Sequence, residues 1–266
     1  MKRIAVLVDF TGVCELAIAH AGLIARQSVA QLVLLHIAPE RNKHKEKELK
    51  DEVRIFGEVL DADGIPFRVQ VSFGDFFETI PRVWDELKSD LVVVGTHGIR
   101  GIQRNLYSEN ILRLINSMKT LTLVVQGHSD IPPEGYTKIL VPVMDEVYSI
   151  HKGELLAEFA GLFDSTINVL NFIYEDDEDG LSTDHIEVIK NQFNELGRPV
   201  NYDSETTSIY VNSYSKSIAQ YAEIEECQLI AWVVPAKDED TKQFSDEDKI
   251  NLILNRFGIP VLYSPR

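Results

Sequence analysis

The sequence contains two copies of one pattern, separated by 135 positions. The apolar run Ile4 to Val8 returns at Ile139 to Val143, and the run 32–37 returns at 167–172. Both offsets are 135, because 139 − 4 and 167 − 32 give the same number. The chain has 266 residues, which fits two domains of about 130 residues, each able to build its own hydrophobic core. We therefore expect a duplicated domain, in which each half serves as a comparison for the other.

Short apolar runs alternate with longer segments of helical periodicity throughout the first half. We expect strands at residues 4–8, 32–37, 67–71, 91–94 and 121–125, and helices around residues 16–24, 45–62, 80–87 and 105–118. Most of these runs are apolar on both faces, as in a covered parallel sheet, but 67–71 alternates with polar residues and is expected at an edge. The alternation predicts an α/β fold with a five-stranded, doubly wound, Rossmann-like sheet and right-handed crossovers.

The second half repeats this scheme after a segment rich in glycine and proline, 126–136, which is typical of a linker. We expect two tandem domains, 1–127 and 137–266. The second has expected strands at 139–143, 167–173, 200–203, 229–234 and 261–263, and expected helices at 151–163, 183–196, 213–224 and 246–256. From the fourth strand on, the offset is 138, which indicates a net insertion of three residues.

Composition limits the function. No run of eighteen apolar residues and no secretory leader is present, so we expect a cytoplasmic protein that does not enter the membrane. The two cysteines, Cys14 and Cys227, lie at unrelated places in the repeat and give no disulfide framework or metal spacing. The net charge is −16; residues 1–136 carry 16 basic and 18 acidic side chains, and the remainder carries 10 and 24. The acidic second half argues against nucleic-acid binding, which needs clustered basic side chains.

Candidate ligand residues follow the first and fourth strands, because doubly wound sheets bind ligands at the carboxyl ends of their strands. Gly95, Gly98 and Gly101 follow the fourth strand, and glycines there allow backbone N–H groups to face an anion. The alternative is a turn that binds nothing. Asp9 follows the first strand and has two interpretations, a hydrogen bond to a ribose or base, or a cap for the next helix.

These residues resemble the universal stress protein family, and specifically its tandem members. The resemblance rests on Val6-Leu7-Val8-Asp9, on Leu34 to Ile37, on Gly74-Asp75 and above all on the segment from Ser89 to Gly98. It implies the adenine-nucleotide alpha-hydrolase-like fold. By the same resemblance, Asp9 contacts the adenosine part of a nucleotide and Ile37 forms an apolar wall for the base.

The phosphate motif departs from the family pattern. ATP-binding members carry a glycine, two residues, a second glycine, nine residues, and then glycine followed by serine or threonine. Gly95 and Gly98 match, but Ser108 and Glu109 stand at the final pair. Ser108 adds a Cβ where the backbone must approach phosphate, and Glu109 adds negative charge. We therefore expect ATP to be disfavoured, and an AMP-like or adenosine-like ligand to be less affected.

The second copy has lost more of the motif. Met144 stands in place of Asp9, and Val233 to Ala236 replaces the segment 95–98. A mostly acidic loop without glycine follows, so neither backbone donors nor charge favour phosphate. We expect this half to be a non-binding partner domain.

No catalytic group and no metal site is predicted. His97 lacks a nucleophile or acid placed beside it, and the acidic run 175–179 lacks the spacing of a calcium loop. The chain is thus interpreted as a stress-response binding or adaptor protein without turnover. Two alternatives stay open, a weak ATPase or nucleotide hydrolase, and a pure interaction protein with both pockets empty.

The last strand of each domain offers an apolar edge that needs cover. The resemblance implies dimerisation through fifth strands, so we expect 121–125 and 261–263 to pair as a pseudo-dimer within one chain. Further homo-oligomers and a protein partner are open expectations, and the sequence identifies neither the partner nor the stress.

Overall fold

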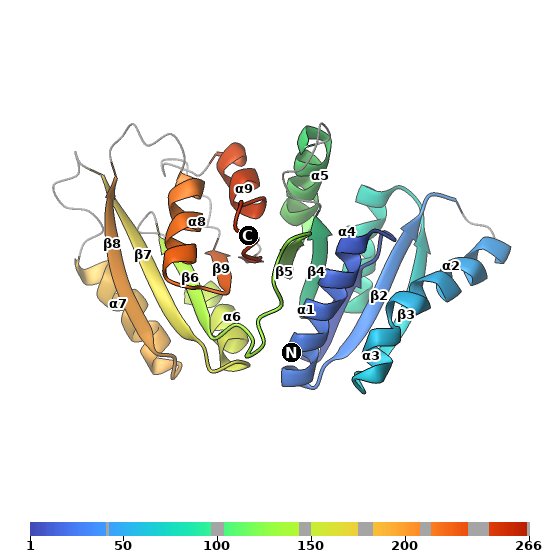
Figure 1. Ribbon diagram of the computed structural model, residues 1–266, viewed down its shortest axis with the longest axis horizontal. Helices are drawn as coiled ribbons and strands as arrows, with labels where there is room; N and C mark the ends of the chain where they lie inside the picture. Colours follow the sequence, from blue (N-terminus) through green and yellow to red (C-terminus); the bar gives the residue numbers. More distant parts are fainter. Residues whose placement is uncertain are drawn as a thin grey trace. The chain divides into compact units, whose positions relative to one another are not determined.

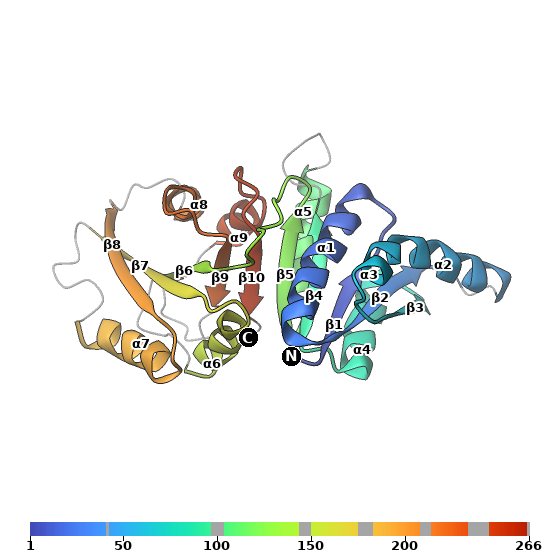
Figure 2. The same cartoon turned by 60° about the horizontal axis from the view of Figure 1, so that its bottom comes forward.

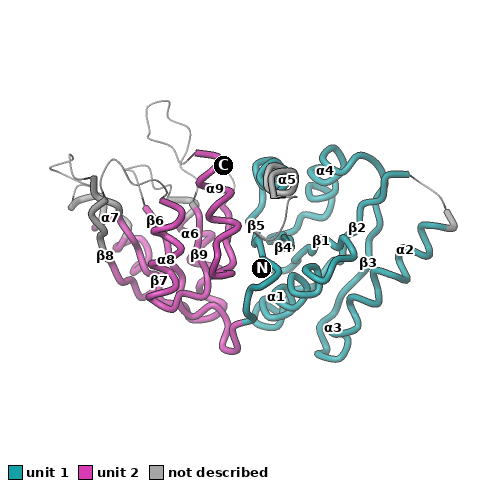
Figure 3. Tube along the Cα trace, turned by 45° about the horizontal axis from the view of Figure 1, so that its top comes forward, with its two compact units in different colours: residues 1–131, 265 teal, residues 132–264, 266 magenta. Residues whose placement is uncertain are grey.

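The computed structural model describes residues 1–40, 43–96, 104–143, 150–174, 183–207, 214–233 and 245–264. The chain forms two compact units, residues 1–131 and residues 132–264 (Figure 3). The predicted pairing of the two terminal strands concerns the placement of one unit against the other, and it stays a prediction.

The first unit is a parallel five-stranded sheet with helices on both faces, which confirms the predicted fold class. Its strand order is β3-β2-β1-β4-β5. Its strands are β1 (Arg3–Leu7), β2 (Gln31–Ala38), β3 (Phe67–Phe73), β4 (Leu91–Thr96) and β5 (Leu121–Gln126). Its helices are α1 (Gly12–Ser28), α2 (Lys43–Phe56), α3 (Glu58–Ala62), α4 (Phe76–Leu87) and α5 (Arg104–Ser117). Helices α4 and α5 lie on one side of the sheet, and α1 and α3 lie on the other (Figure 3).

The central strands are apolar on both faces because helices cover both faces. Ile4, Ala5 and Val6 of β1 are completely buried. The edge strand β3 is only half-buried along most of its length, as its alternating sequence predicts. In the strand order, β1 lies between β2 and β4, so the direction of winding reverses there. The loops that follow β1 and β4 therefore run in opposite directions. Doubly wound sheets bind ligands in the crevice between such loops.

The second unit repeats the architecture with the strand order β10-β9-β6-β7-β8. Its strands are β6 (Lys138–Val143), β7 (Thr166–Tyr174), β8 (Val200–Thr207), β9 (Leu229–Val233) and β10 (Val261–Ser264). Its helices are α6 (Ile150–Gly161), α7 (Thr183–Glu195), α8 (Tyr214–Ile224) and α9 (Asp246–Ile253). Helices α8 and α9 lie on one side of the strands, and α6 and α7 lie on the other (Figures 1 and 2).

The helix predicted over residues 45–62 is divided into α2 and α3, and this expectation was wrong. The two helices meet at Gly57, where an added Cβ would lie 2.4 Å from Cε2 of Phe67 and 3.0 Å from Cδ1 of Leu34. The backbone at Gly57 therefore lies against these two side chains of the sheet, and the Phe67 ring would have to shift to admit a Cβ. A glycine inside a helical pattern does not by itself signal such an approach, because helices tolerate single glycines at a modest cost.

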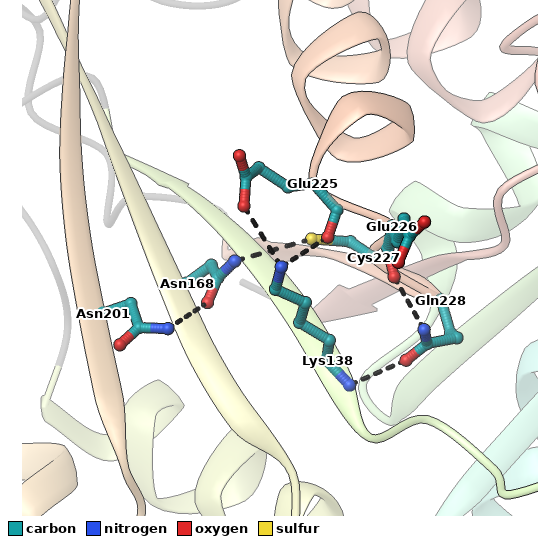
Figure 4. Close-up of polar contacts among 7 residues, drawn as sticks. All are labelled: Lys138, Asn168, Asn201, Glu225, Glu226, Cys227 and Gln228. Carbon is teal, nitrogen blue, oxygen red and sulfur yellow. Dashed lines mark hydrogen bonds and ion pairs between the residues drawn. The ribbon is translucent and has the colours of Figure 1, made fainter.

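Both units join the first strand to the residue before the fourth strand in the same way. In the first unit, Asp90 Oδ2 accepts from the N–H of Arg3 at 3.0 Å, and the Arg3 guanidinium donates to the Leu87 carbonyl. In the second unit, Gln228 Oε1 accepts from the N–H of Lys138 at 2.8 Å, and Lys138 Nζ donates to the Glu225 carbonyl (Figure 4). The paired positions are 135 and 138 apart, the two offsets of the sequence repeat. The duplication thus extends to individual hydrogen bonds.

Among the described residues, no helix combines the length and the apolar character needed to span a bilayer.

Candidate functional site

The carboxyl ends of β1, β2 and β4 bring three of the predicted site residues to one edge of the first sheet. Asp9 follows β1, Ile37 lies near the end of β2, and Gly95 lies near the end of β4. β1 pairs in parallel with both neighbouring strands, so these three ends lie side by side. The carboxyl ends of β1 and β4 also mark the reversal in strand order.

Asp9 is exposed and is oriented by Thr11. Its Oδ1 accepts from the Thr11 N–H at 3.1 Å and from Thr11 Oγ1 at 2.6 Å. Thr11 is the N-cap residue of α1, and its hydroxyl donates to Asp9, but its side chain accepts no capping hydrogen bond from the helix. Among the described residues, only Oδ1 of the Asp9 carboxylate accepts a hydrogen bond, and the first turn of α1 has no side-chain cap.

Phe10 and His36 flank Asp9, and the sequence reasoning did not select either of them. The rings of Phe10 and His36 have their centroids 4.4 Å apart, and Phe10 also lies 5.9 Å from the ring of Phe56 at the end of α2. His36 Nδ1 lies 2.8 Å from the Val8 carbonyl, so this nitrogen carries the proton and donates. Phe10 has a φ of 62°, the left-handed region that few non-glycine residues adopt. A bulky residue directly after the candidate aspartate was the available signal, but its backbone conformation is not readable from sequence.

Gly95 allows α1 to lie close to the end of β4. A Cβ at Gly95 would lie 2.9 Å from Cγ1 and 3.0 Å from the carbonyl oxygen of Val13. Gly127, directly after β5, also faces Val13, with its Cβ position 3.1 Å from Cγ2. Gly95 is therefore required by the packing of the first turn of α1, whatever it contributes to a ligand.

Only some of the other predicted site residues are among those that the structure describes. Ile37 is half-buried at the end of β2. Ser108 lies within α5, but its side chain and that of Glu109 lie outside the described residues, as do Gly98 and Gly101. In the second unit, Met144 and residues 234–236 also lie outside them.

Cys14 lies in the first turn of α1 and is buried. Burial, reinforced by the negative charge of Asp9, raises the pKa of this thiol to about 11. The thiol is therefore protonated near neutral pH, and it is a poor nucleophile. Across the described ranges, no group of three or more His, Cys, Asp or Glu side chains is arranged to hold a metal ion.

The sequence of this half and its geometry agree with a family match. Residues 1–126 match the model of the universal stress protein family. The first half of the chain is a universal stress protein domain. No curated protein matched the chain.

Solved structures extend the similarity in fold beyond the universal stress protein domain to the whole chain. A universal stress protein from Archaeoglobus fulgidus DSM 4304 has 15% identity, covers 99% of this chain and 96% of its own, and gives a TM-score of 0.72. A protein of unknown function from Pseudomonas aeruginosa PAO1 has 15% identity, covers 99% and 92%, and gives 0.65. The cytoplasmic domain of a prokaryotic cation chloride cotransporter has 10% identity, covers 98% and 94%, and gives 0.51. At these identities the similarity shows the fold alone, and it spans both halves.

Proposed function

We propose that the universal stress protein domain binds a small adenosine-type ligand, adenosine or AMP, and that the chain acts as a stress-response binding or adaptor protein. The described part of the site consists of Asp9, Ile37 and Gly95, at the carboxyl ends of β1, β2 and β4. The exposed Asp9 carboxylate carries this proposal. It stands at the reversal of strand order with one oxygen fixed by Thr11 and the other directed to no described partner.

The chemistry of this edge suits a nucleoside. A carboxylate oxygen accepts from ribose hydroxyls or from base N–H groups. Half-buried Ile37 offers apolar surface for a planar base. Phosphate binding is less favourable, because Ser108 and Glu109 stand where ATP-binding relatives carry glycine and a hydroxyl. A single phosphate at the rim meets less of this obstruction than three do.

We propose that the second domain binds no nucleotide and serves packing and partner recognition. The support is its sequence, with Met144 in place of Asp9 and no glycine after its fourth strand. The excess of acidic residues in this half adds electrostatic repulsion against phosphates.

Isothermal titration calorimetry on the full chain tests the proposal. We expect saturable binding of adenosine and AMP, with ATP binding more weakly than AMP. Asp9→Ala should weaken adenosine binding by about tenfold, since losing a charged hydrogen bond costs about 1.5 kcal/mol or more. Asp63→Ala is the matched control, because Asp63 is an exposed carboxylate of the same domain that pairs with Arg26.

ATP binding tighter than AMP binding, or Asp9→Ala without effect, would contradict the proposal. Phosphate release from ATP and magnesium, measured on the same samples, separates a binding protein from a nucleotide hydrolase. Turnover that depends on Asp9 would support the hydrolase in place of the adaptor.

A further inference from the structure

The residue after Asp9 has an unusual backbone. Phe10 has a φ of 62°, a conformation that is unfavourable for a non-glycine residue because its Cβ crowds the backbone. Such a conformation persists only where surrounding contacts hold it in place. The contacts of Phe10 therefore indicate what this backbone geometry is maintained for.

The ring of Phe10 is held by groups from two other elements. It packs against His36 of β2 and Phe56 of α2, with centroid distances of 4.4 and 5.9 Å. His36 is itself fixed, since its Nδ1–H donates to the Val8 carbonyl at 2.8 Å. Val8 in turn donates its N–H to Leu35 at 2.8 Å. The Phe10 ring is thus anchored to β2, three residues beyond the end of β1.

The turn at Phe10 has a direct consequence for Asp9. It directs the chain so that both the N–H and the hydroxyl of Thr11 reach Asp9 Oδ1, at 3.1 and 2.6 Å. Both donors approach the same oxygen. These two hydrogen bonds therefore restrain the orientation of the carboxylate, although the side chain is exposed.

The second half of the chain provides an internal comparison. At the offset of 135, Asp9, Phe10 and His36 correspond to Met144, Asp145 and Asn171. Asn171 is buried, and its Nδ2 donates to the Tyr202 hydroxyl at 3.3 Å. The aromatic pair and the aspartate are therefore absent together from the half that lacks the motif.

We propose that Phe10 is a positioning residue that pre-orients the Asp9 carboxylate for a ligand donor, and that His36 is its anchor. This proposal rests on the proposed nucleoside site. Its geometric part, that the Phe10 ring maintains the left-handed backbone and the Asp9–Thr11 hydrogen bonds, is measurable without ligand. A pre-oriented carboxylate binds more tightly because less side-chain freedom is lost on binding.

The test combines solution NMR of the full chain with adenosine calorimetry. Phe10→Ala removes the ring and keeps the cost of a positive φ, so residue 10 should revert to a negative φ. The expected signs are loss of the strong intraresidue Hα–HN Overhauser effect and an upfield move of the Thr11 amide proton. Adenosine affinity should fall by about tenfold, as expected when restraint worth about 1.4 kcal/mol is lost.

Three further variants make the test specific. Phe10→Tyr keeps the ring and should restore both the spectrum and the affinity. His36→Leu removes the bond to Val8 and should move both in the same direction as Phe10→Ala, which provides a second variant should Phe10→Ala fold poorly. Phe257→Ala, at an aromatic residue of the second unit, should change neither.

The outcomes distinguish this proposal from the proposed function. A Phe10→Ala variant that keeps the Overhauser effect and the Thr11 shift overturns the positioning role, even if the wild type binds adenosine. A wild type that binds neither adenosine nor AMP, while Phe10→Ala still loses the turn, overturns the proposed function and supports the geometric part alone.

Discussion

Asp90 and Gln228 accept the same backbone hydrogen bond, each in its own half of the duplicated chain. One receives the N–H of Arg3 and the other that of Lys138, at 3.0 and 2.8 Å. One is a carboxylate and the other an amide, so the shared requirement is an acceptor oxygen and not a charge.

Asp90→Ala should lower the free energy of unfolding by about 1 kcal/mol, since it leaves the strand N–H to solvent. Asp90→Asn, which keeps an acceptor as Gln228 does, should lie within about 0.5 kcal/mol of the wild type. Urea unfolding followed by circular dichroism measures both. An Asn variant as damaged as the Ala variant would show that charge is what matters at residue 90.

Gly95→Ala should destabilise the first domain by about 2 kcal/mol, because the new methyl group meets the backbone of Val13 as well as its side chain. Gly12→Ala is the matched control, since nothing lies within 4 Å of its Cβ position. It should be neutral or slightly stabilising, because alanine favours helix more than glycine does. In thermal unfolding, the midpoint of Gly95→Ala should lie well below that of the wild type, and the midpoint of Gly12→Ala should equal or exceed it. Equal midpoints for the two variants would refute the packing role of Gly95.

The protein should become less stable on acidification because of His20. Burial lowers the pKa of His20 from 6.5 to about 4. As the pH falls, the His20 imidazole is protonated near pH 6.5 in the unfolded chain, but only near pH 4 in the folded chain. Stability falls as the pH decreases through this window, by up to about 3 kcal/mol from this residue. His20→Gln should flatten the wild-type slope between these pH values in urea titrations; an unchanged slope would exclude His20 as its source.

Both thiols should resist alkylation in the native protein. Burial raises the pKa of Cys14 to about 11 and that of Cys227 to about 12, from an ordinary value of 9.0. Stability should be unaffected by these groups below pH 9 and should fall above it, because the unfolded thiols ionise first. Iodoacetamide labelling followed by mass spectrometry should modify neither residue at pH 8 until denaturant is added. Rapid native labelling of Cys14 would contradict its burial beneath the Asp9 edge.

The fold was predictable because the hydrophobic periodicity is strong and is repeated. The central strands β1, β2 and β4 are buried on both faces, and such runs are hard to mistake when helices alternate with them. Errors arose where polar residues or short-range contacts decide an element. β8 extends to Thr207, beyond the expected end at Asp203. As an edge strand, it needs fewer apolar residues than a central strand.

The end of helix α9 was predicted wrongly because a short-range contact decides it. It ends at Ile253, before the expected 256. Asn255 ends it by exchanging side-chain hydrogen bonds with the N–H and the carbonyl of Ile259, at 3.1 and 2.7 Å. Asparagine occurs in many helices and in many turns, so only its partner four residues later decides which it forms here.

The candidate site stays a prediction, although the structure brings Asp9, Ile37 and Gly95 to one end of the sheet. Asp9 and Ile37 were selected through their position after buried strands and through the family resemblance. Phe10 and His36 were not, because their importance lies in a backbone angle and in a ring contact between residues 26 positions apart. Neither leaves a pattern in a single sequence.

The contact between α1 and the sheet has an evolutionary consequence. Gly127 faces only the Cγ2 of Val13 among nearby side chains, whereas Gly95 also faces the Val13 carbonyl. Relatives that shorten residue 13 are thus free to accept alanine at the position of Gly127. They gain no such freedom at Gly95, where the obstacle is main chain. Covariation should therefore link positions 13 and 127, and position 95 should stay glycine wherever α1 keeps its height above β4.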